Sequence, residues 1–248
     1  MAEHPVEEQR TALVTGASSG IGRAVAVRLR REGWRVLALG RSEAALRSVA
    51  EESGADPFCA DVRDTTTIAR RLADQSIDAV IHAAGVLASR ELFQDIEPDA
   101  IDQMIATNLA APLQLTRALL PGMIARQRGH LVFIGSSAGR WPHPNASVYG
   151  ATKAGVSLFC DALRCDLLGT GVRVTEVAPG RVQTQLYRST LGDDAGTQLY
   201  EGYASIQPEE IAELVATCLQ LPPHVDVSRV EVFPTDQAVG GARIVKAR

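Results

Sequence analysis

The 248-residue chain has few cysteines and no excess of positive charge. Its four cysteines form no CxxC pair and follow no metal-ligand spacing, which argues against a disulfide scaffold and indicates a reducing compartment. The 25 Lys and Arg residues are outnumbered by 29 Asp and Glu residues, and the net charge is −4. A protein that binds nucleic acid mainly through phosphate contacts is usually basic. We therefore expect no metal centre and no nucleic-acid partner.

Long apolar runs and a secretory leader are also missing. No apolar run approaches the ~20 residues that span a bilayer. The N-terminal MAEHPVEEQR lacks the basic start and apolar stretch of a signal peptide. We expect a cytoplasmic protein with no membrane partner, in which residues 1–9 form a flexible tail. The chain does have 46% hydrophobic and 22% charged residues, the usage of a globular protein with a large core.

Short strand-like runs alternate with longer helix-like segments along the chain. The predicted strands are Thr11–Thr15, Arg35–Leu39, Pro57–Ala60, Ile77–Ala83, His130–Gly135, Val172–Val177 and Val227–Phe233. The predicted helices are Ile21–Glu32, Glu43–Glu52, Thr65–Asp74, Ala100–Arg126, Val148–Leu168 and Pro208–Leu219. Each parallel strand needs a crossover, so this alternation predicts an α/β fold in one domain. We expect a Rossmann-type, doubly wound parallel sheet of about seven strands with helices on both faces, a three-layer sandwich.

One segment departs from this regularity. Residues 183–206 are polar, contain several Gly and Asp residues and show weak periodicity. In a compact domain, a segment of this length without clear structure is often a functional lid. We predict that it closes over the substrate.

A glycine-rich turn joins the first predicted strand to the first helix. Gly16, Gly20 and Gly22 in TGASSGIG let the backbone turn sharply and approach a ligand closely, because they carry no Cβ. The following helix directs unpaired N–H groups at the loop, where they attract phosphate. The GxxxGxG spacing alone leaves a plain strand-to-helix turn as an equal alternative. Its place at the first such turn favours a dinucleotide site.

The end of the second predicted strand indicates which dinucleotide binds. An NAD-specific site usually has an acidic residue here for the ribose 2′-OH, but this chain has Gly40 followed by Arg41. A guanidinium can hold a 2′-phosphate, so we predict NADP(H) in preference to NAD(H). Ser18 and Ser42 offer hydroxyls, and Asp61 with Val62 follows the third strand, within reach of an adenine edge. The alternatives are a solvated Arg41 and a turn-forming Asp61.

Four polar residues form a candidate catalytic group. Tyr149 and Lys153 are four residues apart, on one face of a predicted helix, where an ammonium favours the phenolate. Ser136 ends the fifth strand, where its hydroxyl can bond a carbonyl oxygen. Asn108 is a polar residue in a long apolar helix and could orient water behind the lysine. Each residue alone has an ordinary structural explanation. The four together with the phosphate turn are specific, since they come from separate segments that meet at one sheet edge.

Together these motifs resemble the compact, single-domain short-chain dehydrogenase/reductases over nearly all of residues 11–233. The resemblance also rests on Ala83-Ala84-Gly85 and on the run from Pro179 to Thr184. It implies that Tyr149 gives or takes the proton, Ser136 polarises the carbonyl, Lys153 anchors the cofactor and tunes Tyr149, and Asn108 supports a proton relay. The implied cofactor site is Gly16, Ser18, Ser19, Gly20, Ile21, Gly22, Arg41, Ser42, Asp61, Val62, Ala83, Ala84, Gly85, Tyr149, Lys153, Pro179, Gly180, Val182 and Thr184.

Two further features refine the resemblance. The family's usual NNAG reads His82-Ala83-Ala84-Gly85 here, and we expect His82 to be structural rather than catalytic. The C-terminal LPPHVDV and VFPTDQ runs are similar to the NADP-dependent 3-hydroxy acid (serine-type) dehydrogenases and related aldehyde reductases. The resemblance also implies a homodimer or homotetramer, in keeping with two long helices that are apolar on more than one face.

We therefore expect hydride transfer between NADP(H) and a small carbonyl or alcohol substrate, such as a 3-hydroxy or 3-oxo acid. The alternatives are a broad-specificity or biosynthetic carbonyl/aldehyde reductase and, outside the enzymes, a catalytically silent NADP(H)-sensing regulator. Candidate residues for the substrate pocket are Arg140, Trp141, His143, Arg181, Tyr187 and Arg188. Arg140 or Arg181 could hold a substrate carboxylate, although both are also typical surface arginines.

Overall fold

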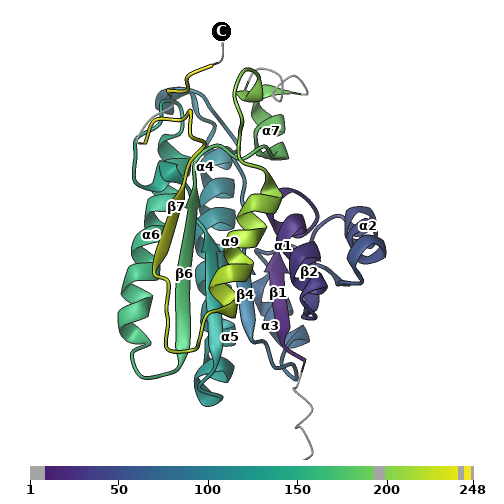
Figure 1. Ribbon diagram of the computed structural model, residues 1–248. Helices are drawn as coiled ribbons and strands as arrows, with labels where there is room; N and C mark the ends of the chain where they lie inside the picture. The colour runs from purple at the N-terminus through teal and green to yellow at the C-terminus, as the bar shows by residue number, and fades with distance from the viewer. Residues whose placement is uncertain (1–8, 193–198, 240–242, 247–248) are drawn as a thin grey trace, which may run out of the picture.

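The computed structural model describes residues 9–192, 199–239 and 243–246. Most of the predicted tail, residues 1–8, lies outside the described residues. Within them, seven strands form one parallel sheet in the order β3-β2-β1-β4-β5-β6-β7 (Figure 1). The strands are β1 Thr11–Thr15, β2 Arg35–Gly40, β3 Asp56–Cys59, β4 Ala79–His82, β5 Gly129–Ile134, β6 Val172–Pro179 and β7 Arg229–Val232. The predicted doubly wound sheet is confirmed.

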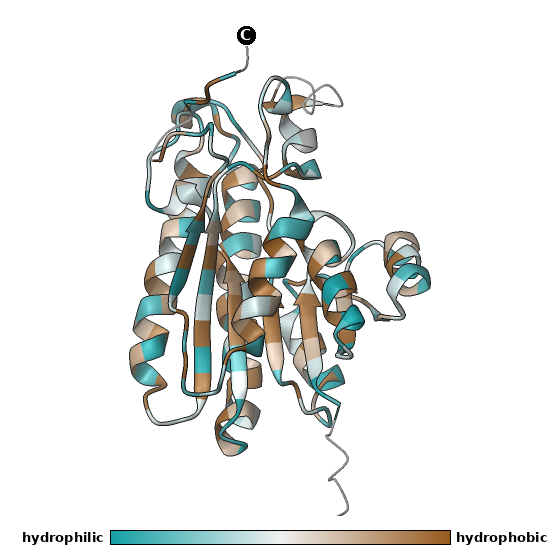
Figure 2. Cartoon of the chain, in the orientation of Figure 1, coloured by the Kyte–Doolittle hydropathy of each residue, from teal (hydrophilic) through white to brown (hydrophobic). Residues whose placement is uncertain are grey.

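Helices cover both faces of the sheet. One face packs against α1 Gly20–Arg31, α2 Glu43–Ser53 and α9 Pro208–Gln220. The other packs against α3 Thr65–Arg71, α5 Ala111–Ala125 and α6 Ser147–Asp166. Alternate residues of β1 enter the two cores, Val14 on the first face and Leu13 on the second, both 0% exposed. Burying each such side chain contributes about 1.5–3 kcal/mol. Figure 2 shows the resulting pattern, with hydrophobic strands between helices that turn hydrophilic residues outward.

The strand order reverses between β1 and β4, which are neighbours although two strands separate them in sequence. At such a reversal the loops leave the carboxyl ends of the two strands in opposite directions and open a crevice between them. The turn after β1 and the Ala83–Gly85 segment after β4 meet there. Thr15 Oγ1 joins them, because it accepts hydrogen bonds of 3.1 Å from both Ala83 N and Ala84 N.

The predicted helix over Ala100–Arg126 is wrong as a single regular helix. The structure has α4 Pro98–Ile105, a π-helical turn η2 Ala106–Ala110 and then α5. Pro112 has no N–H and cannot bond the Asn108 carbonyl four residues earlier. The Asn108 side chain instead bonds backbone outside the helix, as described below. Such π turns are frequent at functional sites.

The other predicted elements differ from the structure mainly at their ends. β4 is shorter than predicted and β6 runs on to Pro179. Four short elements were not predicted, and they are η1 Phe93–Asp95, η3 Ser137–Gly139, η4 Gln185–Tyr187 and α7 Arg188–Leu191. The last two lie in the predicted lid, of which residues 193–198 lie outside the described residues. No helix in the described parts of the chain has the length and apolar character to cross a membrane.

Candidate active site

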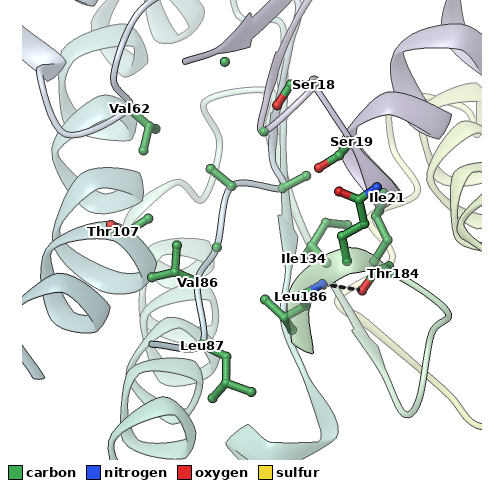
Figure 3. Close-up of a pocket in the computed structure, with 18 of the residues that line it drawn as sticks. Ser18, Ser19, Ile21, Val62, Val86, Leu87, Thr107, Ile134, Thr184 and Leu186 are labelled. Carbon is green, nitrogen blue, oxygen red and sulfur yellow. Dashed lines mark hydrogen bonds between the residues drawn. The ribbon is translucent and has the colours of Figure 1, made fainter. Parts of the chain in front are cut away.

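A cleft of about 520 Å³ opens at the carboxyl ends of the central strands. Its walls come from the β1–α1 turn, the segment after β4, the end of β5, α6 and the segment after β6. In Figure 3, Ser18 and Ser19 of the β1–α1 turn lie at one end, and Val86, Leu87 and Leu186 lie toward the other. The cleft therefore has a polar, backbone-rich end and a more apolar end.

Backbone forms the polar end. Gly16 has φ +68°, and a Cβ there would lie 2.8 Å from the Ala84 backbone. A Cβ on Gly22 would collide with the Gly16 carbonyl. α1 begins at Gly20 with its first N–H groups at the cleft. A cradle of this kind, empty of side chains and facing a helix N-terminus, fits the diphosphate of a dinucleotide.

Side chains at the far end of this cradle come from β2 and from the loop after β3. Arg41, Asp61, Val62 and Arg63 all line the cleft there. Asp61 pairs with Arg63 at 2.7 Å, and the pKa of Asp61 is lowered chiefly by this hydrogen bond. Arg63 was missed in the sequence, although a second basic residue near the end of β3 is the signal that would identify it. Both guanidiniums are exposed and suit a 2′-phosphate.

Ser42 does not lie on the cleft lining of the described residues. Its hydroxyl accepts a 3.3 Å hydrogen bond from Ala45 N and caps the N-terminus of α2. The Ser42 hydroxyl therefore serves as a helix N-cap, a position that serine commonly occupies. The other predicted cofactor residues, from Gly16 through Thr184, do line the cleft.

Three of the four candidate catalytic side chains meet in the cleft. Tyr149 and Lys153 both project from α6, with Lys153 Nζ 5.8 Å from the centre of the Tyr149 ring. Lys153 Nζ donates a 2.8 Å hydrogen bond to the Ile134 carbonyl at the end of β5. Ser136 follows two residues later and lines the same cleft, where its hydroxyl acts to lower the pKa of Tyr149. The spacing of Tyr149 and Lys153 thus brings both groups to one strand end.

Burial dominates the electrostatics of the pair. Desolvation raises the pKa of Tyr149, Tyr187 adds to this effect, and the hydrogen bond with Ser136 opposes it. Desolvation lowers the pKa of Lys153 to about 8, while the negative charge of Glu176 opposes that change. The expected acidification of Tyr149 by Lys153 therefore does not prevail over the effect of burial. Tyr149 keeps its proton at neutral pH, which suits a group that donates one to a substrate oxygen.

Asn108 lies behind Lys153, in the π-helical turn. Its amide bonds the Val86 backbone in both directions, because Oδ1 accepts from Val86 N and Nδ2 donates to Val86 O, each at 2.8 Å. A small cavity of about 10 Å³ is lined by Asn108, Pro112 and Lys153. Its volume is at the lower limit for one water, and polar groups are available to hold that water. The geometry is consistent with the predicted relay role, which stays a prediction.

His82 lies in the core at the end of β4. Its ring stacks on Phe133 with centroids 4.5 Å apart, and Nε2 is 3.0 Å from Thr116 Oγ1. Burial lowers the pKa of His82 to about 3, so the ring is neutral. His82 is not part of the cleft lining. These contacts are those of a structural residue, as expected.

The predicted substrate residues are mostly elsewhere. Among the described side chains, Tyr187 lines the cleft, whereas Arg140, Trp141, His143 and Arg181 do not. Arg140 pairs with Glu231 at 2.7 Å on the surface. The Arg181 guanidinium lies 5.9 Å from the Tyr187 ring centre, and the side chain of Arg188 lies outside the described part of the chain. Residues missed at this end are Val86, Leu87, Ala88, Gln103, Thr107, Gln185 and Leu186.

A family model described as short chain dehydrogenase matches residues 10–194. The chain belongs to this family. This chain is 50% identical to a short-chain type dehydrogenase/reductase, y4eK, of Sinorhizobium fredii, over 98% of both chains. It is 40% identical to sulfoacetaldehyde reductase 2 of Chromohalobacter salexigens, over 91% of this chain and 94% of that protein.

Two further relatives connect the short-chain dehydrogenase to a narrower group. It is 36% identical to the NADP-dependent 3-hydroxy acid dehydrogenase YdfG of Escherichia coli K12, over 94% of this chain and 98% of that one. It superposes with a TM-score of 0.88 on the closed form of a serine dehydrogenase complexed with NADP+, at 36% identity. That match covers 95% of this chain and 99% of the other.

Proposed function

We propose that this short-chain dehydrogenase is an NADP(H)-dependent oxidoreductase that acts on a small carbonyl or hydroxyl substrate. The observation that carries the proposal is the convergence of Ser136, Tyr149 and Lys153 at the end of a cleft whose other end is a glycine cradle. The named activities of YdfG and the NADP+ complex of serine dehydrogenase support the choice of cofactor. The exposed guanidiniums of Arg41 and Arg63, which line the cleft, also support NADP(H) as the cofactor.

The residues of the chain divide the work along the cleft. The β1–α1 turn and the N-terminus of α1 would hold the diphosphate, and Val182 and Thr184 would flank the nicotinamide. When bound, NADPH supplies the hydride that reaches the carbonyl carbon. Ser136 and Tyr149 hold the carbonyl oxygen with hydrogen bonds that strengthen as negative charge develops there. The Tyr149 hydroxyl gives that oxygen its proton, and the product is the alcohol.

Lys153 and Asn108 act behind this reaction centre. The Lys153 ammonium, held on the Ile134 carbonyl, stabilises the phenolate left on Tyr149. Asn108 and the small cavity beside Lys153 offer a place for a water that returns a proton toward the pair. Asn108 thus supports recovery of the proton donor after each turnover.

The substrate we propose is a 3-hydroxy or 3-oxo acid. The relationship to YdfG supports this class. A neutral aldehyde or ketone is the second candidate, because Val86, Leu87 and Leu186 make the substrate end of the cleft largely apolar. The segment 183–206 supplies Leu186 and Tyr187 to the cleft, which supports its role as a lid over either substrate.

We further propose that the chain forms a cytoplasmic homodimer or homotetramer, with a single domain in each subunit. α6 leaves Leu158 at 72% exposure, and Leu168, just beyond the end of α6, is 81% exposed. Exposed apolar surface on α6 supports an interface between copies of the chain, which the resemblance to the family also implies. Light scattering with size exclusion would measure the assembly, and a monomer at micromolar concentration would contradict it.

NADPH oxidation in the presence of a carbonyl panel tests the proposal. The panel contains 3-oxo acids and neutral aldehydes of matched size, each assayed with NADPH and with NADH. We expect turnover with NADPH and the highest kcat/KM for an oxo acid. NADPH binding without any turnover would favour the silent regulator instead. A preference for the neutral aldehydes would favour the broad-specificity reductase.

A further inference from the structure

The catalytic face of α6 continues beyond Lys153. Tyr149, Lys153, Ser157 and Asp161 follow one another at four-residue intervals, so they form one row along the helix. Ser157, one turn beyond Lys153, is buried and donates a 3.0 Å hydrogen bond to Glu176 Oε2. The row connects the reacting end of the cleft to a carboxylate on the neighbouring strand β6.

Glu176 is a buried, ion-paired carboxylate. It is 2% exposed, and a charge at this depth costs several kcal/mol unless it is paired. The Arg229 guanidinium of β7 supplies the pairing, with Nε donating to Oε2 at 2.6 Å. The same guanidinium also contacts Ser157 and Asp161. Glu176 is therefore held as an anion from its outer side.

The second carboxylate oxygen of Glu176, Oε1, lies against Gly135, between Ile134 and Ser136. A Cβ on Gly135 would collide with Glu176 Oε1, so the glycine before Ser136 leaves the space that this oxygen occupies. The hydrogen bonds from Ser157 and Arg229 Nε both end on Oε2, the other carboxylate oxygen. Ile134, immediately before Gly135, carries the carbonyl that accepts from Lys153 Nζ. The negative charge of Glu176 thus lies beside the backbone that positions both Lys153 and Ser136.

The other groups around Lys153 cannot take the place of this anion. Asn108 and the Ile134 carbonyl are uncharged. Burial raises the pKa values of both Tyr149 and the Cys160 thiol, so both keep their protons at neutral pH. Arg229 contacts Glu176 rather than Lys153. Glu176 is the leading charge that favours the protonated form of Lys153.

We propose that Glu176 is a positioning residue of the active site, a buried counter-charge that keeps Lys153 an ammonium on the Ile134 carbonyl. The proposal rests on the proposed function, because it assigns Glu176 a part in the same reaction through Lys153. A purely structural Glu176 would only fasten β7 to α6 through Arg229. The two roles differ in what they do to the pH dependence of Lys153.

Replacing the carboxylate by an amide of the same shape separates these roles. In Glu176→Gln, Lys153 should lose its proton at lower pH. On the alkaline side, the pH at which kcat/KM falls should be roughly one unit lower in this variant. The pH at which the NADPH dissociation constant rises should be lower by the same amount. We call these two changes the alkaline limbs. NADPH fluorescence measures the second quantity without turnover. Glu176→Asp keeps the negative charge, so both alkaline limbs should lie close to their pH in the parent chain.

Asp161→Asn is the matched control. It removes a negative charge from the same guanidinium, but at the outer end of the row, where its side chain is 48% exposed. We expect its pH limbs to coincide with those of the parent chain. If Glu176→Gln does not fold, the double variant Glu176→Gln/Arg229→Gln removes the buried pair together and should still shift both limbs downward.

Unshifted limbs in either folded variant would overturn the proposal. A shift of equal size in Asp161→Asn would overturn it as well, because the effect would then belong to the whole network. The parent chain could reduce no carbonyl compound while Glu176→Gln still shifts the pH dependence of the NADPH dissociation constant. In that case the proposed function fails and the role of Glu176 stands. If the parent chain reduces carbonyl compounds but Glu176→Gln shifts neither pH dependence, the proposed function stands and the role of Glu176 fails.

Discussion

The two ends of the cleft are built from different materials. The cofactor end is mostly backbone, and six residues of the β1–α1 turn, Gly16 and 18–22, line its cradle. The catalytic end is made of side chains from the π-helical turn, the end of β5 and α6. A backbone cradle depends on the absence of side chains, whereas the catalytic group depends on a few polar atoms held by distant segments. Substitutions at the cofactor end should therefore lower the affinity for NADPH, and substitutions at the catalytic end should lower kcat.

Tyr149→Phe is the most severe test of this division. The variant removes the proton donor and leaves the cradle intact. We expect kcat to fall by about 10²–10⁴-fold. The NADPH dissociation constant, measured by fluorescence, should stay within about twofold of the parent value. Near-normal turnover, or a large loss of NADPH affinity, would show that the two ends are not separable at this residue.

Gly22→Ala attacks the other end. The added Cβ collides with the Gly16 carbonyl, so the turn must open. We expect the KM for NADPH to rise by roughly a hundredfold, because several phosphate contacts shift together. Gly122→Ala is the control, since its Cβ meets only the flexible end of Arg126 in α5. Equal NADPH affinities in the two variants would contradict the role of the cradle.

Asn108→Ala removes the amide behind Lys153. We expect kcat to fall by roughly tenfold to a hundredfold, less than the loss of the proton donor itself. Two hydrogen bonds to Val86 also disappear, which should lower the free energy of unfolding by about 1–3 kcal/mol. Steady-state kinetics and urea unfolding measure the two effects. A stability loss without any change in kcat would leave Asn108 a structural residue only.

Arg41→Ala and Arg63→Ala test the adenosine end of the cradle. Each variant removes one cation that can bond a 2′-phosphate, so the kcat/KM ratio of NADPH to NADH should fall about tenfold. Turnover with saturating NADPH should change little. An unchanged ratio in both variants would mean that neither guanidinium selects the cofactor.

Ser42→Ala should have the smallest effect. The variant loses the N-cap of α2, which costs about 0.5–2 kcal/mol of stability. NADPH affinity should not change, because Ser42 does not line the cleft in the described residues. Thermal unfolding and NADPH titration provide the two readings. A clear drop in affinity would return Ser42 to the cofactor site.

The sequence predicted the fold and the cradle well because both follow from local patterns. Apolar runs identify strands that are covered on both faces, and three glycines at the first strand-to-helix turn favour a dinucleotide site. Ser136, Tyr149 and Lys153 could be proposed because each sits at a recognisable place in its own element. Their roles remain predictions, but their convergence depends on the topology that the alternation already implied.

The features that were missed depend on contacts between segments. Apolar periodicity gives no sign of the π turn, because the cause is the bonding of Asn108 to Val86 and the missing N–H of Pro112. Arg63 lies in a loop and Leu186 in the short helix η4, and the sequence pattern defines the position of neither. The upward pKa shift of Tyr149 depends on burial, which spacing along a helix does not reveal.

The π turn also has a genetic consequence. A π turn holds one residue more than a regular α-helical turn, so the helix on either side of it stays in phase. A single-codon deletion between residues 106 and 110 would close this turn into regular α-helix. The inner face of α5 would keep its orientation, but the Asn108 amide would move relative to Val86 and Lys153. The loss of one residue here would therefore damage the active site while leaving the packing of α5 in place.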